Sequence, residues 1–292
     1  MKKAVITGAA GFAGYSTTIE LLNRGYEVFA ILRPGSEHNA RLMSIGGDLH
    51  LIELDCSEFD KIFDMVDTQC DIIYHLAWFG GRDDFNVQKN NVDYCLMALE
   101  SASSLGCKRF VGIGSQAEYG VSDELMNENS MPHPITAYGA AKLAALSLSR
   151  IKCKQLGMEW VWGRIFSLYG DNEPSGRLFP DLINSLRLNK SIILSSCEQN
   201  WDYLHVKDGA SAIVSLGEKG LSDEVYNIAN GNYKPLKCFV EEARSVLNSN
   251  SEIIYGPRAI PFISLQPDVS KITEHTGWMP KISFKEGVLN FE

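Results

Sequence analysis

Apolar and polar positions follow two alternating patterns along the first 166 residues. Short apolar runs rich in β-branched residues predict buried strands, and apolar residues at helical spacing predict helices between them. The predicted strands are 3–7, 27–32, 49–54, 71–77, 109–114 and 159–166, and the predicted helices are 12–24, 57–66, 86–105 and 136–156. This alternation is typical of an α/β fold with a Rossmann-type, doubly wound parallel sheet.

The pattern changes after about residue 166. Glycine, proline and asparagine become frequent, as in "YGDNEPSGRLFP" (169–180) and "NIANGNYKPL" (227–236). We therefore expect a Rossmann domain over residues 1–166. Residues 167–292 should form a smaller mixed lobe over the open edge of the sheet, with some of the chain crossing back.

Composition narrows the classes of function. The net charge is −9, and no block of Lys and Arg offers a footprint for nucleic acid. No apolar run approaches the length of a membrane span. The apolar stretch near the N-terminus is interrupted by Gly8 and Gly11, which favours a buried strand over a secretory signal. The seven scattered cysteines form no CxxC pair, which argues against disulfides or a zinc site and favours a reducing cytoplasm.

A glycine-rich segment directly follows the first predicted strand. Gly8, Gly11 and Gly14 there allow a tight turn, close approach to a pyrophosphate and close packing of the next helix. The N-terminus of that helix, with Phe12 and Ala13, offers free N–H groups to phosphates. The segment predicts a dinucleotide site; a glycine-rich turn without a ligand is the alternative.

The end of the second strand bears on the choice of dinucleotide. An acidic residue there would bind the ribose 2′-hydroxyl of NAD, but the chain has Arg33, with Ser36 and Arg41 nearby. A guanidinium suits the 2′-phosphate of NADP, so we expect NADP, with NAD as the second choice. A solvated loop arginine is the alternative. Asp55, after the third strand, could accept a hydrogen bond from adenine or cap a helix.

Three residues have chemistry suited to proton transfer. Tyr138 and Lys142 are four residues apart on a predicted helix and so share one face. The ordinary pKa of tyrosine is about 10, and a nearby ammonium favours the phenolate and lowers that pKa. Ser115 ends the fifth strand. Small residues from 139 to 141 would let a nicotinamide and a substrate approach closely.

The fixed order of these motifs resembles the extended short-chain dehydrogenases/reductases of the nucleotide-sugar epimerase/dehydratase family. The resemblance covers essentially the whole chain and is strongest to 4-ketoreductases of nucleoside-diphosphate 4-keto-6-deoxyhexoses. Its motifs are "TGAAGFAG" (7–14), "HLAW" (75–78), "NNV" (90–92), "GSQAEYG" (114–120), "YGAAK" (138–142), "RIFSLYG" (164–170), "WDYLHVKDGASA" (201–212), "VYNIANG" (225–231) and "GWMPKISFKEGV" (277–288).

The resemblance implies roles for individual residues. Tyr138 would be the catalytic acid/base, Lys142 would hold the nicotinamide ribose, and Ser115 would hydrogen-bond the reacting oxygen. Asn91 matches an asparagine that supports the active-site helix, although it could be an ordinary buried helix residue. The expected cofactor contacts are Gly8, Gly11, Phe12, Ala13, Gly14, Arg33, Asp55, Leu76, Ala77, Tyr138, Lys142 and Ile165. The expected substrate contacts are Trp78, Gln116, Ser167, Arg177, Tyr203 and Arg258.

The residues after Ser115 separate the reactions of the family. Dehydratases carry acidic residues there, whereas this chain has Gln116 and Ala117, with Glu118 displaced by one position. Eliminating water needs a positioned acid and base, so a dehydratase is disfavoured. Arg33 and the bulky Trp78 favour an NADPH-dependent 4-ketoreductase over an NAD-dependent 4-epimerase. A nicotinamide-binding regulatory module without turnover is the alternative from another class.

Two departures from the family pattern concern the substrate's diphosphate. Ser167 stands where an asparagine is usual, and Trp201 replaces a common arginine. The lost charge weakens diphosphate binding unless Arg177, Arg187, Lys190 or Arg258 compensates. The resemblance also implies a homodimer that pairs through the helices at 86–105 and 136–156.

Overall fold

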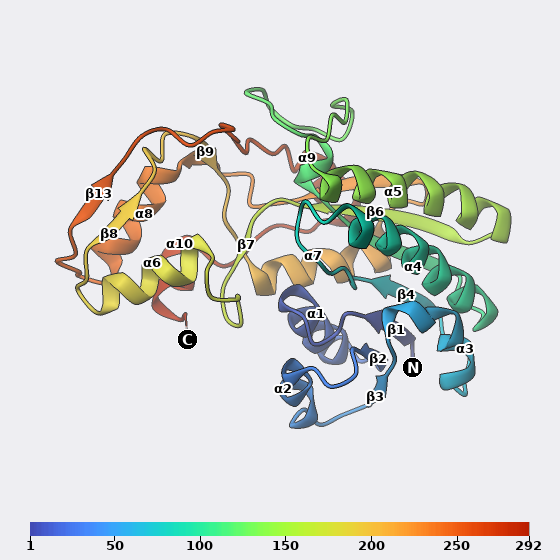
Figure 1. The fold of residues 1–292 in the computed structure, drawn as a ribbon. Coiled ribbons are helices and arrows are strands. Elements are labelled where there is room, and N and C mark those ends of the chain that lie inside the picture. The colour runs from blue at the N-terminus through green and yellow to red at the C-terminus, as the bar shows by residue number, and fades with distance from the viewer. Residues whose placement is uncertain (292) are drawn as a thin grey trace.

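A seven-stranded parallel sheet forms the centre of the computed structural model, which describes residues 1–291 (Figure 1). Its strand order is β3–β2–β1–β4–β5–β6–β11, and every neighbouring pair is parallel. The strands are β1 (Lys3–Thr7), β2 (Glu27–Leu32), β3 (Leu49–Glu53), β4 (Ile72–His75), β5 (Arg109–Ser115), β6 (Glu159–Ile165) and β11 (Glu224–Ile228). The predicted Rossmann-type fold class is thereby confirmed.

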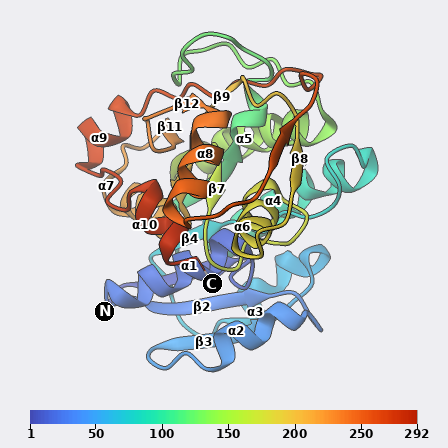
Figure 2. The ribbon, with the colours of Figure 1, turned by 90° about the vertical axis from the view of Figure 1, so that its left-hand side faces the viewer.

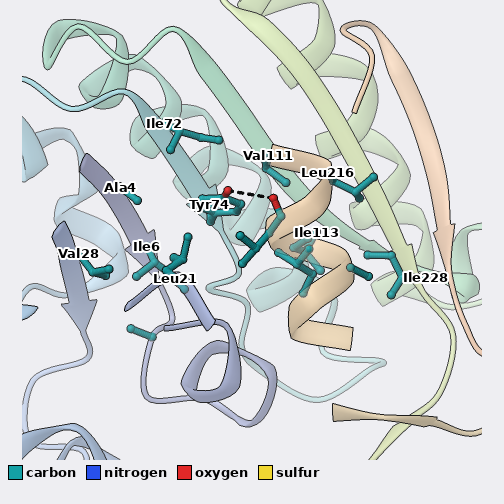
Figure 3. Close-up of a cluster of buried hydrophobic side chains, with 14 of the residues drawn as sticks. Ala4, Ile6, Leu21, Val28, Ile72, Tyr74, Val111, Ile113, Leu216 and Ile228 are labelled. Carbon is teal, nitrogen blue, oxygen red and sulfur yellow. Dashed lines mark hydrogen bonds between the residues drawn. The ribbon is translucent and has the colours of Figure 1, made fainter. Parts of the chain in front are cut away.

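Helices cover both faces of the sheet because both faces of its strands are apolar. One buried cluster lies beneath α1 (Phe12–Asn23) and α7 (Val206–Lys219). Figure 3 shows part of this cluster, in which the Tyr74 hydroxyl of β4 donates a hydrogen bond to the Val214 carbonyl oxygen of α7. A second cluster lies beneath α4 (Phe85–Ser104) and α5 (Ala137–Leu156).

The predicted helix at 57–66 is broken into two short elements. A 3₁₀ helix, η2 (Cys56–Lys61), is itself kinked at Glu58, whose φ is −119°, and it precedes α3 (Ile62–Met65). Two short elements, η1 (Glu37–Asn39) and α2 (Ala40–Met43), fill the segment between β2 and β3, and η3 (Gln116–Glu118) follows β5. The ends of the other predicted elements lie within two residues of those in the structure, and the strands predicted at 3–7 and 27–32 match it at both ends.

The C-terminal lobe faces the viewer in Figure 2 and packs around a cluster of aromatic rings. Tyr169, Phe179 and Tyr203 lie at its centre, with ring centroids 4.6–5.8 Å apart. The lobe comprises β7 (Leu168–Tyr169), α6 (Leu178–Arg187), β8 (Ile192–Leu194), β9 (Asn200–Trp201), β10 (Leu204–His205), β12 (Lys234–Pro235), α8 (Leu236–Val246), β13 (Ile253–Tyr255) and α10 (Phe284–Leu289). Between these elements the chain returns to the sheet as α7, β11 and α9 (Ser270–Thr276), which packs against α7 and β11. Glu292, the last residue of the expected lobe, lies outside the described residues.

The strand order reverses between β1 and β4, and this reversal positions the site. Helices that follow strands on either side of such a point turn to opposite faces and leave a crevice at the carboxyl ends of the strands. Gly8 follows β1 and Leu76 follows β4, so both border this crevice. Within residues 1–291, none of the helices combines the length and the apolarity that crossing a bilayer requires.

Candidate active site

Two adjoining cavities lie at this crevice and share Gly8, Gly11, Leu76 and Trp78 among their walls. The larger has a volume of about 680 Å³, and the smaller about 270 Å³. Of the predicted site residues, the larger cavity is lined by Gly8, Gly11, Phe12, Ala13, Gly14, Leu76, Trp78, Ser115, Gln116, Tyr138, Lys142, Ile165, Ser167, Arg177 and Tyr203. Arg33 and Ala77 line the smaller one, whereas Asp55 and Arg258 line neither.

The glycine turn has the shape that a dinucleotide requires. Gly8 has a φ of +72°, and a Cβ added there would lie 2.7 Å from the backbone nitrogen of Ala77. A Cβ on Gly14 would overlap the carbonyl oxygen of Gly8. No side chain caps the N-terminus of α1, so its first N–H groups remain free for phosphate oxygens. The turn and the helix therefore fit the pyrophosphate of a dinucleotide.

Arg33 lines the smaller cavity, whereas Asp55 does not. Arg33 is exposed and lines this cavity together with Ser36. The Asp55 carboxylate accepts hydrogen bonds from the backbone nitrogen (3.0 Å) and the hydroxyl (2.7 Å) of Ser57, and it caps η2. Of the two roles that the sequence leaves open for Asp55, the geometry corresponds to the helix cap.

Lys142 lies in the wall of the larger cavity. Its side chain is buried, and Nζ donates a 2.6 Å hydrogen bond to the Ile113 carbonyl oxygen. The same ammonium lies 3.7 Å from the centroid of the Trp78 ring and 6.0 Å from that of Tyr138. Burial lowers the pKa of Lys142 to about 7, so its charge is sensitive to groups that enter the site.

Tyr138 is surrounded by groups that set its pKa in opposite directions. Burial raises the pKa of its hydroxyl, which favours the protonated form. A hydrogen bond with Ser115 and the positive charges of Arg82 and Arg177 oppose this effect. Lys142 was expected to lower this pKa. The largest opposing effects in the structure come instead from the other three groups, because Lys142 is directed toward Ile113.

Glu118 is the acidic residue nearest to Ser115 in sequence, and it is withdrawn from the cavity. Its carboxylate is fully buried and accepts hydrogen bonds from the Ser115 backbone nitrogen (2.9 Å) and Trp162 Nε1 (3.1 Å). It also forms a 2.7 Å ion pair with the buried Arg164. These partners hold the carboxylate between β5 and β6, away from the larger cavity.

Gln88 and Asn91 of α4 fix the loop that follows β4. Gln88 accepts a 2.7 Å hydrogen bond from Trp78 Nε1 and donates to the carbonyl oxygens of Phe79 and Gly81. Asn91 donates a 2.9 Å hydrogen bond to the Phe79 carbonyl oxygen. Asn91 therefore supports this loop, whereas the family resemblance implies that it supports the active-site helix.

The lobe side of the larger cavity has little positive charge. Trp201 Nε1 donates a 3.0 Å hydrogen bond to the Ser167 hydroxyl, so the two departures from the family pattern are in direct contact. Arg258 is exposed and stacks on the Phe262 ring, 3.3 Å from its centroid, away from the cavity wall. Arg187 instead bonds the Phe291 carbonyl oxygen. Of the four cations expected to compensate, Arg177 alone lines the cavity, among residues 1–291.

Two charged residues of the larger cavity, Arg82 and Glu173, lie outside the sequence motifs. Arg82 lies in the β4–α4 loop; its carbonyl oxygen accepts a 2.9 Å hydrogen bond from the Tyr138 backbone, and its guanidinium lies 5.7 Å from the Tyr138 ring centroid. Glu173 lies in the loop between β7 and α6. Both belong to polar loops whose path depends on tertiary contacts, so no local signal predicts them. Across the described chain, His, Cys, Asp and Glu form no cluster suited to a metal ion.

Comparisons with known proteins agree with this geometry. The family model described as "NAD dependent epimerase/dehydratase family" matches residues 4–229. The chain is 28% identical to the dTDP-6-deoxy-L-talose 4-dehydrogenase (NAD(+)) of Aggregatibacter actinomycetemcomitans, over 82% of this chain and 88% of that protein. It is 25% identical to the CDP-abequose synthase of Salmonella muenchen, over 98% and 96% of the two chains. The solved UDP-glucose 4-epimerase of Thermotoga maritima has the same fold, with a TM-score of 0.85, 24% identity and coverage of 98% and 96%.

Proposed function

The chain belongs to the NAD-dependent epimerase/dehydratase family, and we propose that it reduces the C4 ketone of a nucleoside-diphosphate 4-keto-6-deoxyhexose with NADPH. This reaction would belong to the biosynthesis of deoxysugars for surface polysaccharides. The observation that carries the proposal is that Ser115, Tyr138 and Lys142 line the same cavity as the glycine turn, while Glu118 is withdrawn from it. Two similar proteins are named for steps on dTDP- and CDP-linked deoxysugars.

The chain's own residues supply the proton chemistry. The nicotinamide, when bound, supplies the hydride. Tyr138, which burial keeps protonated at neutral pH, donates its proton to the developing alkoxide at O4 of the sugar. Ser115 donates a hydrogen bond to the same oxygen and stabilises its charge. Gly8, Gly11 and Gly14 hold the pyrophosphate, and Lys142 binds the ribose next to the nicotinamide.

Arg33 supports NADPH as the preferred cofactor. It is exposed at the smaller cavity beside Ser36, where a guanidinium can pair with a 2′-phosphate. The similar talose dehydrogenase is named for NAD(+), so this preference belongs to the present chain and rests on Arg33.

An NAD-dependent nucleotide-sugar 4-epimerase is the second candidate. The fold shared with a UDP-glucose 4-epimerase favours it, because the same Ser, Tyr and Lys chemistry can oxidise and re-reduce C4. An epimerase retains its cofactor and leaves the oxidation level of the sugar unchanged. The two candidates therefore differ in whether the cofactor is consumed.

Mixing the purified protein with a dTDP-, CDP- or GDP-linked 4-keto-6-deoxyhexose and NADPH tests the proposal. We expect the absorbance of the reduced nicotinamide to fall by one equivalent for each sugar reduced. Tyr138→Phe should bind NADPH normally and lose activity by about 10²- to 10⁴-fold. Interconversion of two sugars without consumption of NADPH would favour the epimerase. A cellular effect that survives Tyr138→Phe with cofactor bound would favour a regulatory module.

A further inference from the structure

Glu173 places a carboxyl group with an unused hydrogen-bonding atom in the wall of the larger cavity. One carboxyl oxygen is stabilised by the backbone of Gly170. The other, Oε2, is buried and has no hydrogen-bond partner among residues 1–291. A buried polar atom without a partner is costly, so this oxygen requires a partner that enters through the cavity.

The groups around Glu173 offset only part of the cost of burying its negative charge. Burial raises its pKa to about 7, and the positive charge of Arg177 opposes this rise. Tyr203, which directly precedes β10, interacts with Glu173, and burial keeps the Tyr203 hydroxyl protonated. His205 lies next to Gly170, and burial lowers its pKa, so it is neutral near pH 7. Asp171, on the same loop, forms an ion pair with Lys207 and does not line the cavity.

The surroundings of Glu173 are poor in cations for a site that must bind a diphosphate. Trp201 and Ser167 are hydrogen-bonded to each other in place of charged or amide groups. From the lobe, Arg177 is the cation that lines the cavity within the described chain. A diphosphate drawn to Arg177 would meet an ionised Glu173 beside it, and the two negative charges would repel each other. Protonation of the carboxyl removes that repulsion and turns Oε2 into a donor.

We propose that Glu173 is a specificity-determining residue that accepts the substrate's diphosphate only as the neutral acid, with its Oε2–H donating a hydrogen bond to a phosphate oxygen. Binding then takes up one proton whenever Glu173 is ionised in the free protein. This inference rests on the proposed nucleotide-sugar substrate. It adds to that proposal the protonation state in which Glu173 binds the substrate's diphosphate.

The direction of the pH dependence follows from linkage. Below the pKa of the free carboxyl, Glu173 already carries its proton and affinity is constant. Above that pKa, each bound substrate must first collect a proton, so Kd rises about tenfold for each pH unit. A substitution that is always neutral removes this dependence and binds more tightly than the native chain in alkaline solution.

Isothermal titration calorimetry of the full chain loaded with NADPH tests the inference, with UDP-glucose and dTDP-glucose as probes. These sugars are already alcohols at C4, so NADPH cannot reduce them, and their diphosphate diester has no group that ionises near neutral pH. Titrations in buffers of different ionisation enthalpy count the protons taken up. We expect close to one proton at about pH 8, and a Kd about tenfold weaker at about pH 8.5 than at about pH 7.5.

Glu173→Gln should take up close to one proton fewer than the native chain at about pH 8, lose the tenfold weakening of Kd between about pH 7.5 and pH 8.5, and bind about tenfold more tightly than the native chain at about pH 8. Asp171→Asn, on the same loop but outside the cavity, should retain the native pH dependence. Lys142 also has a pKa of about 7 and lines this cavity, and it is unchanged in both variants. NADPH affinity and melting temperature report whether each variant is folded.

The outcomes separate this inference from the proposed function. Nucleotide-sugar binding without proton uptake, or native pH dependence in folded Glu173→Gln, overturns the role of Glu173 and leaves the proposed function standing. If Glu173→Gln does not fold, the proton count of the native chain still decides, since a count of zero contradicts the inference. If neither nucleotide sugar binds the native chain, the proposed substrate class fails and this inference fails with it.

Discussion

Tyr138 transfers the proton in the proposed reaction, and its pKa is set by opposing neighbours. Burial raises the pKa, while Ser115, Arg82 and Arg177 lower it. Arg82 is exposed and lies in a loop fixed by Gln88 of α4, so its guanidinium stays near the ring with little cost in buried charge. It is a positioning residue that lowers the pKa of Tyr138.

Arg82→Gln should shift the pH profile of turnover. Loss of the positive charge makes the phenolate less stable, which raises the pKa of Tyr138. Because the reductase needs the protonated hydroxyl, the fall in kcat on the alkaline side should move up by about half a pH unit. Arg82→Lys, which keeps the charge, should retain the native profile. An unchanged profile in Arg82→Gln would contradict this role.

Arg33 should decide the choice between the two dinucleotides. Arg33→Glu places a negative charge where the 2′-phosphate would pair, and we expect KM for NADPH to rise at least about tenfold, since a charged hydrogen bond contributes about 1.5–3 kcal/mol. KM for NADH should change little. Steady-state kinetics with both cofactors check this, with Arg33→Lys as the control. Equal losses with NADPH and NADH would show that Arg33 does not contact a 2′-phosphate.

Among the elements, β1, β5, α1 and α5 were predictable because each has a strong local sequence pattern. The functions of some of their residues were not. Gly139 was expected to leave room for the nicotinamide and substrate, yet an added Cβ there would overlap the carbonyl oxygen of Ala117. Its absence lets α5 approach η3. In the sequence, Glu118 stands one position beyond the catalytic acids of dehydratases. Its ion pair with Arg164, which is distant in sequence, is visible only in the folded structure.

Gly139→Ala tests this contact between α5 and η3. The added methyl group meets backbone, which cannot rotate away, so we expect a loss of about 1–3 kcal/mol in the free energy of unfolding. Urea unfolding measures it. Ala140→Gln, on the exposed side of the same turn, should change the free energy by less than about 0.5 kcal/mol. Similar values for the two variants would contradict the close packing.

For the whole molecule, the return of the chain to the sheet was harder to predict than the sheet itself. α7 and β11 follow the first lobe elements in sequence. In the structure, β11 completes the sheet, and α7 covers the same face of the sheet as α1. The sequences of α7 and β11 have the apolar spacing of a helix and a strand. The place of each element in the fold depends on contacts with residues distant in sequence, which that spacing does not predict. Arg258 was expected to contact the substrate, but in the structure its guanidinium stacks on Phe262 and does not line the larger cavity.

We propose a homodimer that pairs through α4 and α5. Apolar side chains remain exposed there, including Leu148 (45%) and Ile151 (57%) of α5, as expected of a helix face that a second copy covers. Ile151→Glu should convert the dimer to a monomer, measured by light scattering after size-exclusion chromatography. Ile193→Glu, at an exposed site in the lobe, serves as the control. A native chain that elutes as a monomer would contradict the proposal.

The most direct measurement of the central claim follows the hydride. The protein is supplied with a nucleoside-diphosphate 4-keto-6-deoxyhexose and NADPH carrying deuterium at the transferable position, and the product is analysed by NMR. The proposed reductase predicts one deuterium at C4 of the deoxysugar for each NADPH oxidised, and its loss in Tyr138→Phe. A product inverted at C4 that contains no deuterium, with the NADPH unconsumed, would contradict it.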